Sequence, residues 1–586
     1  MCGIFGQISQ SKINRKKLDK LVKHSEQRGV DSSGLIYNNN NKYKIYRADY
    51  NIKKLIKSVM PYDSNIVLGH SRLITNGLND NQPVVRGDIC VIHNGIITNE
   101  KNIWDQLSVE RKYQIDSEVI VAIAEEHLKN DGKISEIQKK VFSLCKGIIA
   151  CALVLPNKGK LVLFSNNGSL YAGYLGSDIY FASENYSLYQ IGCSDIKQIK
   201  ENSLILDIPT TDKKLSIIDD NHRIENLIPE FKFHKSEEKL LEYAILNLKR
   251  CTKCILPETM PFIIFDEEGV CNYCHNYQMK NIAKPKEELF KLVESYRKKG
   301  DIFDCIVPFS GGRDSSYGLH LIVNELKMKP ITYTYDWGMV TDLGRRNISQ
   351  VCAELGVENI IVAANISQKR KNIKMNLDAW LKSPHLGMMA MLTAGDKHFF
   401  RHVESIKNQT GIDLNLWGVN PLEQTHFKTG FLGIKPDFEE DKVYTNGIIK
   451  QLRYHTKRFK AMTESMGYFN RSIWDTLSGE YYRSFTKKQH YYHIFDYWTW
   501  NEGTVNNTLI NQYGWETAID TSTTWRIGDG TAGFYNYVYY TVAGFTEHDT
   551  FRSNQIKRKL NKRLLIMIFL IILIWIYTGM GKRVKK

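Results

Sequence analysis

A short apolar run, a loop of serine and glycine, a helical segment and a second apolar run follow one another between residues 303 and 335. The apolar runs, at residues 303–308 and 330–335, have the length and composition of buried strands. Residues 317–326, between them, are typical of a helix. Because strands joined through a helix normally pair in parallel with a right-handed crossover, this order predicts an open parallel sheet with helices on its faces.

The length of the chain predicts more than one such unit. At 586 residues it is far longer than one hydrophobic core organises, so we expect an α/β protein of several domains. Its 42% hydrophobic and 24% charged residues match ordinary globular proteins, which excludes a disordered, collagen-like or coiled-coil main body. Eleven cysteines, an odd number, and the lack of an N-terminal signal peptide favour the reducing cytoplasm over a disulfide framework.

The net charge of +16 is concentrated at the end of the chain. Residues 551–586 contain ten lysines and arginines and no acid, so we expect no nucleic acid as a partner of the main body. Residues 564–581 are an uncharged run of eighteen residues, which as a helix of about 27 Å barely matches a ~30 Å hydrocarbon core. The tail at 557–586 therefore has two interpretations, a membrane anchor or a noncatalytic end such as a shifted reading frame produces.

Residues 1–230 are expected to form a first domain of mixed α/β type. Short apolar strands at 89–92 and 160–164 alternate with turns, and Leu18, Leu21 and Val22 recur at helical spacing. An amphipathic stretch at 231–250 predicts a helix that connects this domain to the rest of the chain.

Cys2 is the first chemically distinctive residue. The small residue after the initiator usually permits removal of Met1, which would leave Cys2 with both a thiol and a free α-amine. With pKa values near ~8 for the amine and ~8.5 for the thiol, the amine can serve as the base that activates the thiol. Cys2 is therefore a candidate nucleophile that carries its own base.

Three further segments accompany Cys2, at residues 27–34, 69–72 and 93–97. Together they resemble the class II glutamine amidotransferases, N-terminal-nucleophile (Ntn) hydrolases that release ammonia from glutamine. The resemblance covers about the first 230 residues and implies an αββα sandwich with glutamine as substrate. Two departures are visible, since Gln-Arg-Gly-Val at 27–30 stands where the family usually has His-Arg-Gly-Pro, and Ser-Arg-Leu at 71–73 where many members have Thr-Arg-Trp.

The same resemblance implies roles for five residues. Cys2 would form the thioester, and the Asn94 side chain with the Gly95 backbone N–H would form the oxyanion hole. Preorganised donors of this kind contribute about 3 to 4 kcal/mol each to the developing charge. Arg72 would bind the α-carboxylate of glutamine, and Asp116 would bind its α-ammonium group.

Four cysteines form two CxxC pairs, Cys251 with Cys254 and Cys271 with Cys274, sixteen residues apart. This spacing is typical of a tetrahedral zinc site and predicts a small four-cysteine module over residues 251–280. Four cysteine ligands leave no open coordination position, which favours a structural Zn²⁺ over a catalytic one. Reduced structural cysteines and a sulfur-transfer role are the alternatives.

The loop after the first apolar run has the sequence Ser-Gly-Gly-Arg-Asp-Ser-Ser at 310–316. Paired glycines before a helix N-terminus create a concavity that binds anions, and the spacing differs from a Walker A loop. The pattern resembles the PP-loop ATP pyrophosphatases, HUP-like doubly wound domains that adenylate an oxygen and release pyrophosphate. The resemblance implies that ATP and Mg²⁺ bind here, with ATP held by Ser310, Gly311, Gly312, Asp314, Ser315 and Ser316.

Segments at 392–396, 420–431 and 523–530 look like parts of one PP-loop subgroup, the N-acetyl sugar amidotransferases of surface-polysaccharide (lipopolysaccharide) synthesis. The synthetase domain is accordingly expected over residues 281–556. Asp396 and Lys428 are candidates for binding the acceptor or phosphate, with an ordinary turn aspartate and a solvated lysine as the alternatives. We expect no catalytic role for the segment at 523–530.

One domain would release ammonia and the other would activate an oxygen with ATP, which predicts a cytoplasmic synthetase with a channel between two sites. The subgroup resemblance implies a nucleotide-linked or sialic-acid-like N-acetyl sugar as acceptor, whose acetamido group becomes an acetamidino group. Amidation of a carboxylate, as in asparagine synthetase, and a tRNA-modifying PP-loop enzyme are the alternatives. The cysteine module speaks against the first, and the ammonia-releasing domain speaks against the second.

Overall fold

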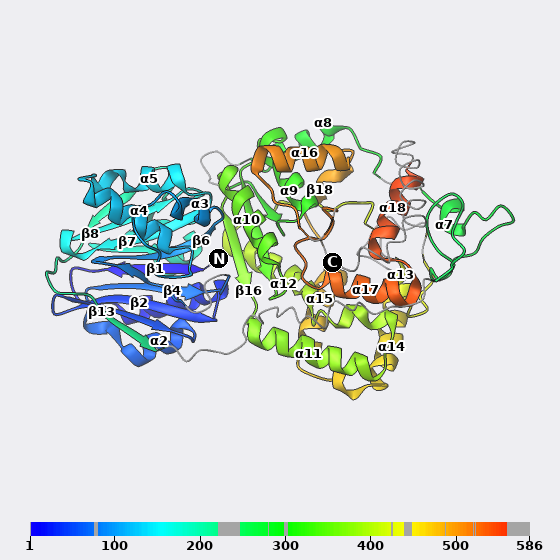
Figure 1. Cartoon of the computed structure of the whole chain (residues 1–586), viewed down its shortest axis with the longest axis horizontal. Helices are drawn as coiled ribbons and strands as arrows, with labels where there is room; N and C mark the ends of the chain where they lie inside the picture. The colour runs from blue at the N-terminus through cyan, green and yellow to red at the C-terminus, as the bar shows by residue number, and fades with distance from the viewer. Residues whose placement is uncertain are drawn as a thin grey trace.

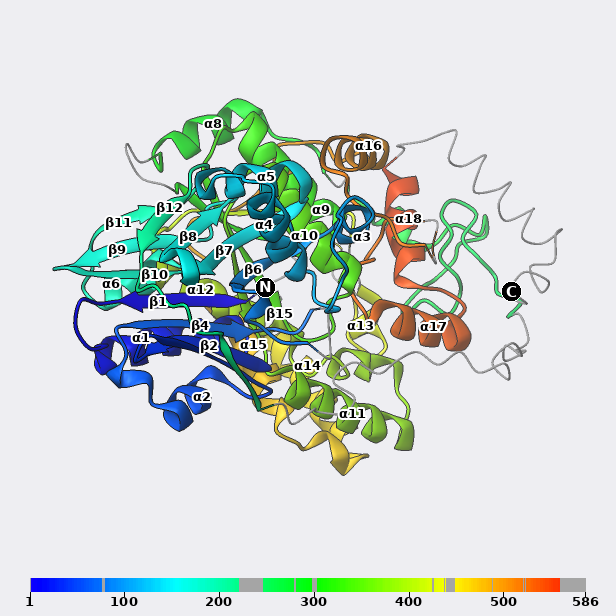
Figure 2. The ribbon, with the colours of Figure 1, turned by 60° about the vertical axis from the view of Figure 1, so that its left-hand side comes forward.

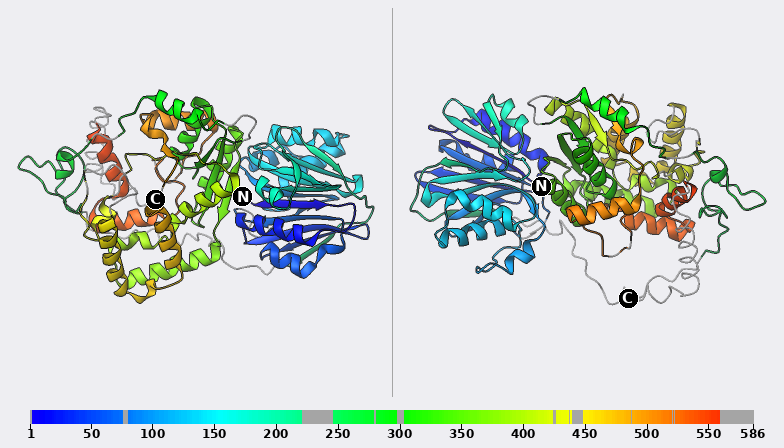
Figure 3. Two further views of the ribbon diagram at one scale, coloured as in Figure 1. Left: turned by 180° about the vertical axis from the view of Figure 1, so that it is seen from behind. Right: turned by 90° about the horizontal axis from the view of Figure 1, so that it is seen from above.

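The structure is a computed structural model that describes residues 2–75, 80–220, 246–278, 281–297, 303–423, 426–436, 438, 448–486, 488–519, 521 and 523–558. An N-terminal domain, blue to cyan, lies beside a C-terminal domain, green to red (Figures 1 and 3). The expected connecting helix at 231–250 and the tail at 557–586 lie almost wholly outside the described residues. Within the described part of the chain, no helix has the length and apolar character needed to cross a bilayer.

Two stacked sheets form the centre of the N-terminal domain (Figure 1). The larger sheet contains, in spatial order, β11 (Ser194–Gln198), β9 (Tyr171–Leu175), β10 (Asp178–Ala182), β1 (Gly3–Ile8), β4 (Ile66–Arg72), β2 (Ser32–Asn39), β3 (Lys42–Ala48) and β13 (Ser216–Asp220). The smaller sheet contains β12 (Leu204–Asp207), β8 (Lys160–Ser165), β7 (Gly147–Leu155), β6 (Ile89–Ile97) and β5 (Val84–Arg86). Apolar side chains from both sheets, among them Ile4, Leu68 and Ile92, form one buried cluster between them.

Helices cover the outer faces of both sheets. On the larger sheet these are α1 (Arg15–Ser25), α2 (Ile52–Val59) and α6 (Asn185–Gln190), and on the smaller sheet α3 (Glu100–Trp104), α4 (Glu118–Lys129) and α5 (Ile137–Leu144). Helix α1 shows why the sequence folds this way, since Asn14 caps it by accepting the Lys17 N–H and the predicted stripe of Leu18 and Leu21 is buried. The domain is the αββα sandwich that the sequence predicted.

The C-terminal domain contains a five-stranded, wholly parallel sheet. Its spatial order is β16 (Asn359–Ala363), β15 (Pro330–Asp336), β14 (Cys305–Pro308), β17 (Asn415–Trp417) and β18 (Tyr491–His493). Chain order runs outward from β14 in both directions, which makes the gap between β14 and β17 the switch point of a doubly wound sheet. Ligands of such sheets bind outside the carboxyl ends of the strands at this point, where the Ser-Gly-Gly loop lies.

Helices cover both faces of this sheet. On one face pack α8 (Lys286–Glu294), α9 (Arg313–His320) with the π-helical η6 (Leu321–Glu325), α10 (Asp342–Glu354) and α16 (Glu502–Tyr513), and on the other α12 (Phe399–Thr410). The helix expected at 317–326 thus begins four residues earlier, because the loop itself enters the helix at Arg313.

The remaining helical elements of the C-terminal domain are α7 (Asn272–His275), α11 (Ile366–Lys382), η7 (Leu386–Met391), η8 (Asp396–His398), α13 (His426–Gly430), α14 (Ile448–Thr463), η9 (Met466–Tyr468), α15 (Ser472–Ser484), η10 (Ile494–Asp496), α17 (Ala532–Ala543) and α18 (Glu547–Lys557). Of these, α7, α17 and α18 lie on the side that faces away from the N-terminal domain (Figure 1). Short 3₁₀ turns of the N-terminal domain are η1 (Glu26–Arg28), η2 (Pro61–Asp63), η3 (Ile134–Glu136) and η4 (Pro156–Lys158). Residues 480–500 are rich in aromatic side chains, of which Phe495 and Trp500 are buried and Tyr481 is exposed.

The two domains meet along α10, which contacts β6 and β7 and lies at the junction of the domains in Figure 1 and beside these strands in Figure 2. Leu73, Ile96 and Ile148 of the N-terminal domain belong to the same buried apolar cluster as Ile348 and Val351 of α10. The domain contact is therefore an extension of the C-terminal core rather than a wet surface contact.

Candidate functional site

Cys2 immediately precedes the central strand β1 and is buried. Because Gly3 pairs with Ser71 of β4, the register places Cys2 beside Arg72. The Cys2 Sγ–H donates to the Leu73 carbonyl over 3.8 Å. Burial raises the pKa of the Cys2 thiol, and the positive charges of the chain's amino terminus and of Arg72 oppose this rise.

Arg72 and Asp116 belong to the same electrostatic site as Cys2. Both are buried, and both act on the Cys2 charge, Arg72 favouring the thiolate and Asp116 opposing it. The Asp116 carboxylate is fixed by the Ile97 N–H, which donates to Oδ2 over 2.8 Å. Burial lowers the pKa of Arg72, and the nearby Cys2 and Asp116 oppose this change. An opposed cation and carboxylate beside a thiol match the groups needed to hold an amino acid by its own α-carboxylate and α-ammonium.

Asn94 and Gly95 lie on β6, a strand that contacts both β1 and β4. Asn94 is buried, and its Oδ1 accepts no hydrogen bond from the described residues. A Cβ on Gly95 would lie 1.8 Å from the Ile148 carbonyl oxygen, so the backbone can pass here only as glycine. Both residues lie in a strand paired with β7 rather than in a loop, and their role as oxyanion donors stays a prediction.

The segment at 27–30 supports the site from behind. Arg28 is buried and its Nε donates to Glu184 over 2.6 Å, while the Gln27 side chain donates to both oxygens of the same carboxylate. Gly29 then packs against the backbone of Arg72 and Leu73, where a Cβ would lie 2.3 Å from the Leu73 nitrogen. Sequence reasoning missed Glu184, because nothing in its local sequence distinguishes it from a surface glutamate.

Ser349 of α10 joins the C-terminal domain directly to the strands of the predicted oxyanion hole. Its hydroxyl donates to the Ile96 carbonyl and accepts the Ile148 N–H, both over 2.7 Å, and it is fully buried. One residue further along α10, the Gln350 side chain accepts a 2.8 Å hydrogen bond from the Thr98 hydroxyl. The strand that carries Asn94 and Gly95 is thus held from the C-terminal domain, and no local sequence signal identifies Ser349.

A cavity of about 520 Å³ lies beside this contact. It is lined from the N-terminal domain by Thr75 and residues 96–102, and from the C-terminal domain by Asp342, Arg345, Arg346 and Glu516. Nearby, burial raises the pKa of Asp31 to about 6, and the hydrogen bond from the Ile74 N–H opposes this rise. Polar groups of both domains therefore surround a hollow next to the predicted glutamine site.

The Ser-Gly-Gly loop follows β14 and opens α9. Gly311 has a left-handed backbone (φ +71°), and a Cβ there would lie 2.6 Å from Ile348 and 2.7 Å from the Gly344 carbonyl of α10. Ser310 is exposed and its Oγ lies 3.0 Å from Ser315 Oγ. The first N–H groups of α9 have no acceptor within the helix, as at every helix N-terminus. Binding of a polyphosphate by this loop stays a prediction.

Asp314 and Ser316 are engaged with other parts of the C-terminal domain rather than free in the loop. Asp314 Oδ1 accepts the Trp500 indole N–H over 2.7 Å, and Oδ2 accepts from Asn420 over 3.4 Å. Ser316 is fully buried in α9. The roles assigned to both in ATP binding remain predictions.

Asp396 and Lys428, separated by 32 positions in the chain, lie close enough in the structure to interact electrostatically. Burial lowers the pKa of Lys428 well below its usual value, and Asp396 is among the charges that oppose this shift. Lys428 forms an ion pair with the fully buried Glu547 and lies 4.9 Å over the ring of Tyr535. Burial would raise the pKa of Asp396, but Lys397 and a hydrogen bond from Thr393 outweigh it and hold the pKa below its usual value.

Arg526 completes this cluster, although we expected no catalytic role for its segment. Its Nε lies 3.2 Å from Glu547 and its Nη2 lies 3.8 Å from Glu423. Its backbone is left-handed (φ +49°), a conformation that costs energy for a non-glycine residue and often marks functional sites. Two residues on, the Gly528 carbonyl accepts the Thr341 N–H over 3.1 Å just before α10, so the segment passes beside the loop.

The four cysteines converge as their spacing predicted. All are buried and their sulfur atoms lie within 4.8 Å of one another, with Cys251 to Cys274 at 3.8 Å and Cys254 to Cys271 at 3.7 Å. A tetrahedron with Zn–S bonds of ~2.3 Å has sulfur-to-sulfur edges of ~3.8 Å, so the donor set fits zinc. The Cys254 and Cys271 N–H groups donate to Cys251 Sγ over 3.4 and 3.2 Å, as thiolate ligands require.

Residues 70–190 match the protein-family model described as "Glutamine amidotransferase domain". The glutamine–fructose-6-phosphate aminotransferase (isomerizing) of Wigglesworthia glossinidia brevipalpis is 33% identical over 182 residues, 29% of this chain and 29% of that protein. The enzyme of the same name from Campylobacter jejuni is 31% identical over 216 residues, 35% of this chain and 36% of that protein. The chain thus spans about a third of the length of these relatives. It carries a class II glutamine amidotransferase domain in its N-terminal part.

Among solved structures, the chain is similar to glutamine phosphoribosylpyrophosphate amidotransferase from B. subtilis complexed with ADP and GMP. The identity is 14% and the TM-score 0.30, over 74% of this chain and 94% of that chain. It is also similar to NH3-dependent NAD synthetase from Campylobacter jejuni, at 15% identity and a TM-score of 0.17, over 30% of this chain and 74% of that chain.

Proposed function

We propose that the chain is a glutamine-dependent, AMP-forming amidotransferase whose two sites share α10. Cys2 would attack the glutamine amide carbon and break its C–N bond, which releases ammonia and leaves a thioester that water hydrolyses to glutamate. Asn94 and Gly95 would stabilise the oxyanion, and Arg72 and Asp116 would hold the amino-acid end. The observation that carries the proposal is that one helix contacts the oxyanion strands through Ser349 and the Ser-Gly-Gly loop through Gly344.

At the second site, the carbonyl oxygen of the acceptor would attack the α-phosphate of ATP and pyrophosphate would leave. Ammonia then attacks the activated carbon and AMP leaves with the oxygen, so that a C=N bond replaces the C=O bond. Activation is needed because an amide carbonyl is a poor electrophile. The loop at 310–316 would hold the phosphates with Mg²⁺. Lys428 and Arg526, which both pair with Glu547, would contribute donor groups to the acceptor side of the site.

The acceptor class rests on the resemblance of the three later segments to the N-acetyl sugar amidotransferases. We infer an N-acetylated sugar, nucleotide-linked or sialic-acid-like, whose acetamido group becomes acetamidino for a surface polysaccharide.

Replacement of Cys2 by alanine tests the division of labour. We expect the Cys2→Ala protein to lose glutamine-dependent product and to keep product formation with added ammonium, because only the ammonia source is removed. Mass spectrometry of product and AMP from glutamine, ATP and candidate N-acetyl sugars measures both. Loss of both activities in a folded Cys2→Ala protein, or formation of ADP in place of AMP by the wild type, would overturn the proposal.

A further inference from the structure

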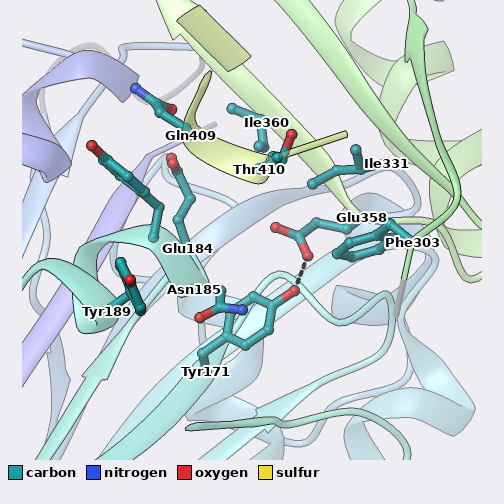
Figure 4. A pocket seen from close by; sticks show the side chains of 12 residues that line it. Tyr171, Glu184, Asn185, Tyr189, Phe303, Ile331, Glu358, Ile360, Gln409 and Thr410 are labelled. Atoms are coloured by element: carbon teal, nitrogen blue, oxygen red, sulfur yellow. Dashed lines mark hydrogen bonds between the residues drawn. The ribbon is translucent and has the colours of Figure 1, made fainter. Parts of the chain in front are cut away.

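A second cavity, of about 300 Å³, lies between the domains at the opposite end of the parallel sheet from the ATP loop (Figure 4). On the C-terminal side it is bounded by the amino-terminal ends of β14, β15 and β16 and by the end of α12. On the N-terminal side it is bounded by β9 and α6. Neither the glutaminase nor the synthetase chemistry uses it.

Glu358, just before β16, points into this cavity (Figure 4). Its side chain belongs to a residue that is only 2% exposed. The Tyr171 hydroxyl donates to Oε2, and Gln198 approaches the same oxygen at 3.4 Å, whereas none of the described residues donates to Oε1. Burial raises the pKa of Glu358 to about 8. A buried carboxyl group with one oxygen unpartnered and facing a hollow lacks a donor.

The charged groups around the cavity determine whether a ligand that donates to Glu358 should be a cation or an anion. The other carboxylate of the lining, Glu184, is already neutralised by Arg28 and accepts from Gln27 at both oxygens. Glu358 has no ion-pair partner among the described residues, so a bound cation would stabilise its ionised form and a bound anion would destabilise that form.

Aromatic rings form much of the remaining wall, namely Tyr171, Tyr186, Tyr189 and Phe303. Tyr189 is 70% exposed. Ring faces attract cations that carry N–H groups, and they also accommodate a flat apolar body. We propose that this cavity binds a small organic cation of the amidinium or primary ammonium class, whose N–H groups donate to Glu358 Oε1.

A chain of contacts connects the cavity to the predicted glutamine site, so a ligand bound in the cavity can affect that site. Gln409 in the cavity wall donates to the Gln27 side chain over 3.5 Å, and Gln27 and Arg28 share Glu184. Gly29, the next residue, packs on the backbone of Arg72. Occupancy is therefore expected to alter the KM for glutamine. If the product of the proposed reaction carries an acetamidino group, the product belongs to this class of cation. Only this identification of the ligand with the product rests on the proposed function.

Isothermal titration of the full chain with benzamidine and with benzamide tests the site, because the two probes share a shape and differ in charge. Excess glutamate is present, so that the predicted amino-acid site is occupied and no amide is hydrolysed during the titration. We expect benzamidine to bind at least tenfold more tightly than benzamide. Its affinity should rise about tenfold from pH 7 to pH 9, because ionisation of a group with a pKa near 8 grows by that factor.

Two variants locate the binding. Glu358→Gln keeps the shape and an acceptor for Tyr171 and should lose at least tenfold in benzamidine affinity. Tyr189→Ala removes an exposed ring, leaves the core intact and should lose about two- to fivefold, whereas Tyr481→Ala, which removes another exposed ring on α15, should change nothing. Equal binding of the two probes, or unchanged benzamidine affinity in both cavity variants, would overturn the proposal. Because binding is measured without turnover, failure of the proposed reaction would leave this result readable.

Discussion

The hydroxyl of Ser349 hydrogen-bonds to both β6 and β7 across the domain boundary, and its removal has a calculable cost. In Ser349→Ala, the Ile148 N–H and the Ile96 carbonyl lose their 2.7 Å partner in a fully buried setting. Each buried group left unpaired costs about 1 to 3 kcal/mol. These two groups lie next to Gly95 in the paired strands β6 and β7, so part of this cost falls on the oxyanion geometry.

If the transition state for thioester formation bears about 1 to 3 kcal/mol of it, kcat/KM for glutamine should fall about 5- to 150-fold. Ammonium-dependent product formation should stay within about twofold, because no residue of the Ser-Gly-Gly loop is changed. Glutamate release, with and without ATP, and AMP formation from ammonium measure the two activities separately. Ser367→Ala, at an exposed position of α11, is the matched control.

The pattern of the two activities decides the matter. Wild-type glutaminase activity in Ser349→Ala would refute the reasoning, as would an equal loss of glutamine- and ammonium-dependent product. A lowered melting temperature by itself would not distinguish the cases, so the ammonium activity serves as the internal measure of correct folding.

Three further outcomes are expected. Purified protein should contain about one zinc per chain by elemental analysis, because four convergent thiolates repel one another when no cation lies between them. Cys271→Ser should lose the zinc and have a lowered melting temperature. Bound iron, or no metal in a stable protein, would contradict this. Arg526→Gln should lower AMP formation at least tenfold while glutamate release stays unchanged, since Arg526 lies in the cluster with Lys428 and Glu547. Arg15→Gln, at an exposed position, is the control. Unaltered AMP formation in Arg526→Gln would show that Arg526 is not part of the site. Folded Glu358 keeps its proton up to about pH 8, and the unfolded chain loses it near 4.5, so the wild-type free energy of unfolding should fall between these pH values. Glu358→Gln should therefore gain stability relative to the wild type from pH 5 to pH 9 in urea denaturation, and parallel pH profiles of the two proteins would argue against a raised pKa.

The amino-acid sequence determined the features that depend on neighbours in the chain. The strand, Ser-Gly-Gly loop and helix at 303–326 predicted a parallel sheet, because the connection and the turn chemistry are local. Two CxxC pairs predicted a convergent four-cysteine cluster, because each pair presents two thiols from one turn. The order of Cys2, Arg72 and Asn94 indicated an Ntn hydrolase, whose sandwich is present.

Tertiary structure alone decided which distant groups meet. Ser349 hydrogen-bonds to Ile96 and Ile148 across the domain boundary. Arg526 and Lys428 both pair with Glu547. Glu358 points one oxygen toward a cavity whose opposite wall comes from the N-terminal domain. A serine on a helix, an arginine in a loop and a glutamate before a strand carry no local mark of these roles. Their meaning arises from burial and from the partners that packing brings within 4 Å, because removal from water makes each unpaired polar group costly and each satisfied one specific.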